Sequence, residues 1–120
     1  MLVVVVGPCG SGKTTLVKRL QALGYTARAV AQEHSQIGEL WKHGGTPDAL
    51  IFLDASPATI TRRRRNEFPE WLYNVQIERL ASARRNATFY LHTDRVPSAE
   101  VQRRVIEHLS TLQRAQAAQK

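Results

Sequence analysis

Short apolar runs alternate with helical patterns along this chain. Residues 2–6 are one leucine and four valines, and such a run before a Gly-Pro break is typical of a strand buried on both faces. Apolar runs over 50–53 and 88–91 predict two further strands, and 25–31 is a weaker candidate. The hydrophobic pattern therefore predicts about four strands.

The first half of the chain predicts two helices between these strands. Over 13–23 the apolar side chains recur at helical spacing, and Gly24 follows where a C-cap belongs. A shorter helix is expected around 37–41, where Ile37, Leu40 and Trp41 precede two consecutive glycines.

The second half predicts three more helices. Ser56 suits an N-cap and Pro57 a first helical position, so a helix begins there and frays near 66–69. A long amphipathic helix is expected over 70–85, and Ser98 is expected to cap a terminal helix that ends in a frayed tail over 114–120. The side chains expected to face inward from these last two helices are Trp71, Leu72, Val75, Leu80, Val101, Val105, Leu109 and Leu112.

The order of these elements predicts the fold class. Strands and helices alternate over 120 residues, and no repeat or linker interrupts them. Such alternation implies right-handed crossovers and a parallel sheet covered by helices on both faces. We expect one α/β domain over residues 1–120, a three-layer α/β/α sandwich with a small, mostly parallel sheet of about four strands.

A phosphate-binding motif lies between the first strand and the first helix. Residues 7–14 read Gly-Pro-Cys-Gly-Ser-Gly-Lys-Thr and satisfy the pattern G-x-x-x-x-G-K-[ST] in full. The glycines allow successive N–H groups to point at a phosphate, Lys13 can reach the β- and γ-phosphates, and the Thr14 hydroxyl is placed to ligate Mg²⁺. We expect ATP–Mg²⁺ to contact Gly7, Pro8, Cys9, Gly10, Ser11, Gly12, Lys13, Thr14 and Thr15.

Two acidic side chains are candidates for metal binding or proton transfer beside the phosphates. Asp54 closes the apolar run Leu-Ile-Phe-Leu and is expected at the carboxyl edge of the sheet, where it would hold Mg²⁺ with Thr14. The alternative is that Asp54 only caps the next helix. Glu33 follows the second strand and could accept a proton from an acceptor hydroxyl, or it is simply a solvated loop residue.

The charge of the chain is concentrated in arginine. The net charge is +7, and six of these charges fall in residues 61–120. Four consecutive helical residues point about 100° apart, so only one or two of Arg62–Arg65 can face a ligand. We expect Arg62 and Arg63 to stabilise a transferring phosphoryl group, with a plain basic surface as the alternative. Nucleic-acid binding is a further alternative, not favoured because no aromatic residues interleave with the arginines.

Composition excludes several classes of protein. A single cysteine, Cys9, excludes an internal disulfide framework and a multi-cysteine zinc site. The longest apolar run is far shorter than the roughly 20 residues that span a bilayer. We expect a cytoplasmic protein without a membrane partner.

The chain resembles the P-loop NTPases of the nucleotide and nucleoside kinase group, thymidylate kinase-like proteins among them. The resemblance is carried by the opening strand with its phosphate loop, by 47–65 (PDALIFLDASPATITRRRR) and by 91–101 (LHTDRVPSAEV). It implies ATP–Mg²⁺ binding by Lys13 and Thr14, an arginine of the 62–65 run at a lid, the loop 93–97 near the adenine, and Glu33 near the acceptor.

One departure from that group separates two functional hypotheses. Those kinases have another strand and an acceptor-binding insert in the region that only 34–51 fills here. The first hypothesis is a kinase-like protein that transfers the γ-phosphoryl group of ATP–Mg²⁺ to a small, unidentified acceptor, with Lys13, Glu33, Arg62 and Arg63 as catalytic residues. The second is a nucleotide-binding module or slow NTPase that has no acceptor and acts through a partner.

Overall fold

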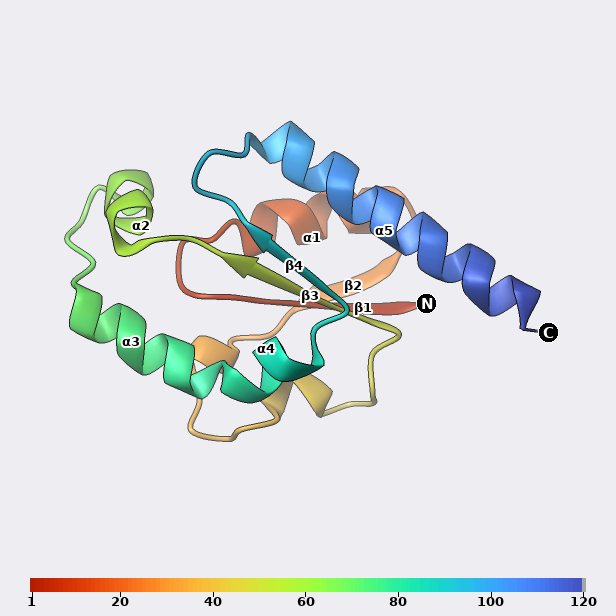
Figure 1. The fold of residues 1–120 in the computed structure, drawn as a ribbon, viewed down its shortest axis with the longest axis horizontal. Helices are drawn as coiled ribbons and strands as arrows, with labels where there is room; N and C mark the ends of the chain where they lie inside the picture. The colour runs from red at the N-terminus through yellow and green to blue at the C-terminus, as the bar shows by residue number, and fades with distance from the viewer. Residues whose placement is uncertain (120) are drawn as a thin grey trace.

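The computed structural model describes residues 1–119. Its centre is a sheet of four parallel strands in the order β2-β1-β3-β4 (Figure 1). The strands are β1 (Leu2–Val6), β2 (Thr26–Ala29), β3 (Ala49–Asp54) and β4 (Phe89–His92). The expected small parallel sheet is confirmed.

Helices cover both faces of this sheet (Figure 1). One face packs against α1 (Lys13–Ala22) and α5 (Ser98–Ala118). The other packs against α3 (Glu70–Arg79), α4 (Ala81–Asn86) and the 3₁₀ turn η2 (Leu40–Lys42), with the turn η1 (Gln32–His34) beside α3. The remaining helix, α2 (Pro57–Arg64), lies beyond the carboxyl ends of the strands. The α/β/α arrangement therefore agrees with the expected fold class.

Strand β1 lies in the centre of the sheet, which accounts for the apolar run over residues 2–6. Strand β1 pairs with β2 on one side and with β3 on the other. Val3 and Val5 lie in the core under α1 and α5, whereas Val4 and Val6 lie in the opposite core with Phe52. Because both faces of the strand are buried, every position after Leu2 is apolar.

Several predicted boundaries are wrong. The second strand covers only 26–29 of the predicted 25–31. The helix predicted over 37–41 is instead η2, preceded by η1. The helix predicted over 70–85 divides at Leu80, which ends α3 and precedes α4, and Trp71 is 66% exposed instead of facing inward.

The terminal helix also differs from its prediction. Ser98 is the first residue of α5 and the flanking Pro97 is the N-cap, without a side-chain cap. Residues 114–118 continue α5, so a frayed tail is wrong there, while residue 120 lies outside the described residues. Alanine and glutamine are good helix formers, which explains why the helix continues without core contacts.

Candidate functional site

The phosphate loop connects the end of β1 to the start of α1. Gly7, Gly10 and Gly12 have φ of 154°, 76° and 103°, a region that L side chains rarely adopt. A Cβ on Gly7 would lie 1.9 Å from the Leu53 carbonyl oxygen of β3. The backbone conformation expected of the three glycines is therefore present, and at Gly7 close packing also requires the absence of a side chain.

Lys13 lies folded along this loop. Its ammonium donates to the carbonyl oxygens of Gly7 at 2.8 Å and Pro8 at 3.0 Å, and to Glu33 Oε2 at 2.6 Å. The side chains of Lys13 and Glu33 are only 12% and 4% exposed. The structure thus brings together two residues that are 20 positions apart in the sequence.

Glu33 reaches Lys13 from the short turn η1. Its other carboxylate oxygen, Oε1, is buried and has no hydrogen-bond partner within residues 1–119. A buried carboxylate oxygen without a donor is costly, so a ligand proton or a cation that reached this atom would relieve that cost.

A cavity of about 280 Å³ opens beside the loop. Backbone, hydroxyl and basic groups surround it, as a phosphate site requires. Thr14 and Thr15 are exposed there. Its lining residues are Gly10, Gly12, Lys13, Thr14, Thr15, Arg63 and Arg64.

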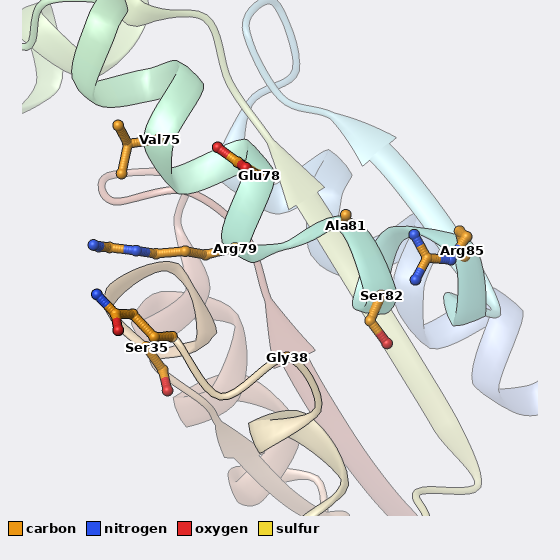
Figure 2. A pocket seen from close by; sticks show the side chains of 9 residues that line it. Ser35, Gly38, Val75, Glu78, Arg79, Ala81, Ser82 and Arg85 are labelled. Atoms are coloured by element: carbon orange, nitrogen blue, oxygen red, sulfur yellow. The ribbon is translucent and has the colours of Figure 1, made fainter.

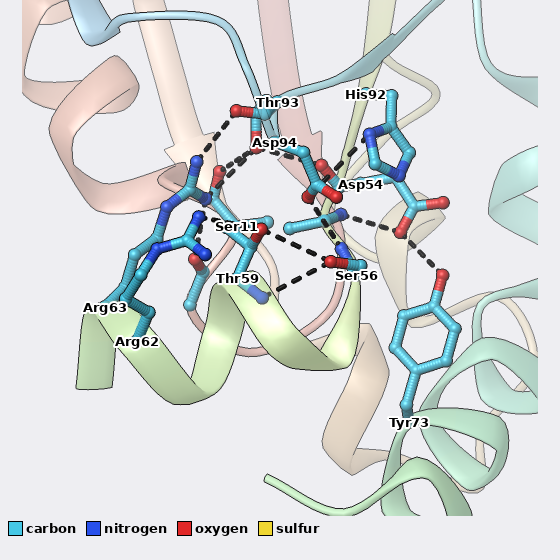
Figure 3. A network of polar contacts seen from close by, with 12 residues as sticks. Ser11, Asp54, Ser56, Thr59, Arg62, Arg63, Tyr73, His92, Thr93 and Asp94 are labelled. Atoms are coloured by element: carbon cyan, nitrogen blue, oxygen red, sulfur yellow. Dashed lines mark hydrogen bonds and ion pairs between the residues drawn. The ribbon is translucent and has the colours of Figure 1, made fainter. Parts of the chain in front are cut away.

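The arginines of α2 take different directions. The Arg63 guanidinium donates to the Gly10 carbonyl oxygen at 3.1 Å and to Thr93 Oγ1 at 3.1 Å and Thr93 O at 2.8 Å (Figure 3). Arg62 instead contacts Thr59 within its own helix, at 3.3 Å. Arg64 reaches Cys9 Sγ at 3.3 Å. Arg63 and Arg64 line the phosphate cavity, whereas Arg62 is not among its lining residues.

Asp54 lies at the carboxyl edge of the sheet, as expected, but its hydrogen bonds lead away from the phosphate loop. Its Oδ1 accepts from the Tyr73 hydroxyl at 2.9 Å (Figure 3) and from the Ala55 N–H at 2.8 Å. Its Oδ2 accepts from the Tyr90 hydroxyl at 2.6 Å. Burial, together with the Asp54 carboxylate, raises the pKa of Tyr90 to about 12 and raises that of Tyr73 well above its usual range. Both hydroxyls therefore stay protonated and act as donors.

A second cavity of about 370 Å³ adjoins the phosphate cavity and lies between the loop, α1 and the start of α5. The two share Gly12, Thr15 and Arg63. The 93–97 segment, expected near the adenine, contributes Val96 and Pro97. The other lining residues of this second cavity are Ser11, Leu16, Ser98, Val101 and Gln102.

A cavity of about 490 Å³ lies between the segment after η1 and the α3–α4 pair (Figure 2). Arg79 extends from α3 toward the 35–38 segment and donates to the Glu33 carbonyl oxygen at 3.3 Å. Ser35, Gln36, Glu78, Ser82 and Arg85 are further polar lining residues. This polar cavity is therefore linked to η1 through the contact of Arg79 with the Glu33 carbonyl oxygen.

Two supporting residues were not predicted. Gln76, 2% exposed, accepts from the Cys9 N–H through Oε1 at 3.0 Å and so fixes the phosphate loop from α3. Arg79 fixes the backbone of Glu33 in the same way. The only signal in the sequence is a glutamine and an arginine at spacing i, i+3 on one helix. Polar pairs at this spacing are common on solvated helix faces, so the pattern does not single these two residues out.

Together, the four-stranded parallel sheet, the flanking helices and the glycine loop before α1 define an α/β fold of the P-loop type. No protein-family model matches the chain, and neither does a curated protein sequence. Among solved structures, the chain is similar to shikimate kinase from Bacteroides thetaiotaomicron, at 17% identity over 98% of this chain and 97% of that chain, with a TM-score of 0.48.

Clustered metal ligands and membrane-spanning helices are both absent from the described part of the chain. Within residues 1–119, no group of three or more His, Cys, Asp or Glu side chains is arranged to hold a metal ion. Over the same residues, every helix is too short or too polar to cross a membrane.

Proposed function

We propose that this chain binds ATP–Mg²⁺ at the phosphate loop and transfers the γ-phosphoryl group to a small acceptor. The observation that carries the proposal is the position of Lys13, which lies between the phosphate loop and Glu33 and lines the phosphate cavity. Arriving phosphates would replace Glu33 as the counter-charge of the ammonium.

The residues around the phosphate cavity supply charge and orientation. The N–H groups of the loop and the N-terminus of α1 would hold the β-phosphate. Arg63 and Arg64 line the open side, where their charge would stabilise the transferring group. Arg62 would need to leave Thr59 to take the same role, so its contribution is proposed to be secondary.

The donor set suits Mg²⁺ bound through the nucleotide. Mg²⁺ keeps several waters and takes one or two protein oxygens beside the phosphates. The exposed Thr14 hydroxyl is such an oxygen. Asp54 remains a proposed metal carboxylate, although this role requires displacement of Tyr73 or Tyr90. When bound, the metal neutralises phosphate charge.

The acceptor would approach through the cavity of about 490 Å³ that Arg79 lines. Glu33 Oε1 would accept the proton of an acceptor hydroxyl, while Arg79 holds the backbone of η1 in place. In this proposal Glu33 is the base that acts between the acceptor and Lys13.

A nucleotide-binding module without an acceptor is the second candidate. It is favoured by one observation: β2 pairs directly with β1, and the 30–48 segment contains only the turns η1 and η2. The strand and acceptor-binding insert implied by the resemblance are therefore not present in this segment.

Two measurements test these functions: the first tests ATP binding, which both require, and the second separates them. Binding of ATP, with and without Mg²⁺, is measured by calorimetry for the wild type, for Lys13→Ala and for Lys18→Ala, an exposed lysine of α1 as control. We expect Lys13→Ala alone to abolish binding, and unchanged affinity would refute nucleotide binding at the loop. Incubation with γ-labelled ATP and a panel of small hydroxylated acceptors then distinguishes transfer from binding alone, since labelled product identifies the kinase and label released only as phosphate identifies the module.

A further inference from the structure

We infer that Gln102 of α5 selects the base of the bound nucleotide by recognising the 6-amino group of adenine. This inference rests on the proposed nucleotide binding and concerns the cavity of about 370 Å³ beside the phosphate loop. It adds a specificity-determining residue to that site.

The cavity has the form that a purine requires. Leu16, Val96, Pro97 and Val101 give it apolar walls, which suit the faces of a planar base. It adjoins the phosphate cavity, with which it shares the lining residues Gly12, Thr15 and Arg63. A nucleotide with its phosphates on the loop would therefore have this space beside it for its base.

Gln102 lies on the side of this cavity away from the phosphates. It is absent from the lining of the phosphate cavity but also lines a neighbouring groove between α1 and α5, with Arg19 and Arg103. A base held between the apolar walls would therefore present an edge to Gln102 rather than to the phosphate loop.

The Gln102 carboxamide has one hydrogen bond to its own helix. Its Nε2 donates to Ser98 Oγ, one turn earlier in α5, at 3.3 Å. Within residues 1–119, no hydrogen bond occupies Oε1 or the second Nε2 proton. One acceptor and one donor of Gln102 therefore remain for a ligand edge.

This pair of groups complements adenine. Adenine presents an amino donor, N6, next to a ring-nitrogen acceptor, and glutamine is the side chain that pairs with N6 and N7 in a bidentate manner. Guanine carries an oxygen acceptor in place of the amino group and would oppose Oε1. None of the ten described residues that line the cavity carries a carboxylate, the group that best matches the two adjacent donors of guanine.

The test compares ligands that differ in one group each. Calorimetry with Mg²⁺ gives dissociation constants for ATP, GTP, purine riboside triphosphate (which lacks the 6-amino group) and inorganic tripolyphosphate (which lacks a nucleoside). These are measured for the wild type, for Gln102→Ala and for Gln113→Ala, an exposed glutamine of the same helix.

We expect the wild type to bind ATP about tenfold more tightly than GTP or purine riboside triphosphate, as for one good side-chain contact to a base edge. Gln102→Ala should remove this difference and leave tripolyphosphate affinity unchanged, while Gln113→Ala should behave as the wild type. An ATP-to-GTP ratio that Gln102→Ala does not change would overturn the role of Gln102 alone. Failure of the wild type to bind any nucleotide or tripolyphosphate would overturn both this role and the proposed function.

Discussion

The ammonium of Lys13 lies 2.6 Å from Glu33 Oε2 in a nearly buried ion pair. Each charge is the main compensation for the other, because Glu33 Oε1 has no partner within the described chain and Lys13 otherwise meets only carbonyl oxygens. The phosphate lysine is thus neutralised by the residue proposed to act as the base. In the proposed nucleotide binding, phosphate would replace Glu33 as the partner of Lys13.

Glu33→Gln should make the chain more dependent on nucleotide. Removing one partner of a buried pair leaves an uncompensated charge, which destabilises a fold by about 3–5 kcal/mol. ATP–Mg²⁺ would restore a counter-charge to Lys13, so its addition should raise the Tm of the variant by more than that of the wild type. Thermal unfolding with and without ATP–Mg²⁺ measures this difference.

Glu39→Gln is the matched control, since Glu39 forms an exposed pair with Lys42 at 3.4 Å. It should change neither the Tm nor its response to ATP. Equal ATP-induced shifts in the wild type and Glu33→Gln would contradict the proposed exchange of partners.

Gly7→Ala should disrupt the fold of the phosphate loop. The new Cβ would meet the Leu53 carbonyl oxygen at 1.9 Å, and φ is 154°. Neither backbone can move without disturbing β1 or β3, so we expect a loss of about 3 kcal/mol or more in the free energy of unfolding. Gly38→Ala is the control, because an added Cβ there meets nothing within 4 Å. Urea unfolding of both variants gives the comparison, and a loss at Gly7 no larger than at Gly38 would be inconsistent with the close packing.

Arg63→Ala should weaken ATP binding more than Arg62→Ala. Arg63 joins Gly10 to Thr93 and so holds the phosphate loop against the segment that follows β4 (Figure 3). Loss of charged hydrogen bonds worth about 1.5–3 kcal/mol should lower the affinity at least tenfold. Within residues 1–119, the Arg62 guanidinium has a single hydrogen bond, to Thr59, so its removal should matter less for binding. Calorimetric titration with ATP–Mg²⁺ tests the order, with Arg114→Ala as an exposed control; equal losses would refute it.

Tyr90→Phe should destabilise the fold through Asp54. The Tyr90 hydroxyl is the partner of Asp54 Oδ2 at 2.6 Å, and Asp54 is only 7% exposed. Leaving a buried carboxylate oxygen without its donor should cost about 1.5–3 kcal/mol in the free energy of unfolding. Urea unfolding measures this cost, and Tyr25→Phe, a half-buried tyrosine that packs against the core through its ring, should cost less. A cost for Tyr90→Phe no greater than that control would show that the contact is weak.

His108 should make stability depend on pH. Burial lowers its pKa below the ordinary value of 6.5, and its ring stacks on Phe89 with centroids 5.0 Å apart. Since the unfolded chain binds the proton more readily, stability contributed by neutral His108 is present above about pH 6.5 and is lost as the pH falls below it. In His108→Gln the free energy of unfolding should fall less between about pH 7 and pH 5. An unchanged slope in urea unfolding at the two pH values would exclude His108 as a cause.

Much of the sheet could be predicted because its strands are buried. Strand β3 is buried at all six positions and β1 at four of five, so the apolar runs coincide with the strands. Strand β2 lies at the edge of the sheet and has one buried residue, Ala27. Its sequence therefore has no run of apolar residues, which explains why it is the weaker strand candidate. The division at Leu80 has no local signal, since neither glycine nor proline is near it.

The site could be predicted only in its sequence-local part. The phosphate motif specifies Gly7–Thr14 because these residues are contiguous. The choice among four adjacent arginines depends on the rotation of α2, which the fully buried Ile60 sets by packing in the core with Phe68. The pairing of Asp54 with two tyrosines depends on how α3 and β4 meet the end of β3, and no spacing in the sequence encodes it.

The contact between Gly7 and β3 restricts how the protein can respond to a ligand. Because the first glycine of the loop packs directly on the Leu53 carbonyl, a shift of this part of the proposed nucleotide site would also disturb β3. We therefore expect any ligand-induced movement in α2 and the 65–69 connection to α3. A spectroscopic label on that connection would report ligand arrival, whereas one on β3 would serve as a fixed reference.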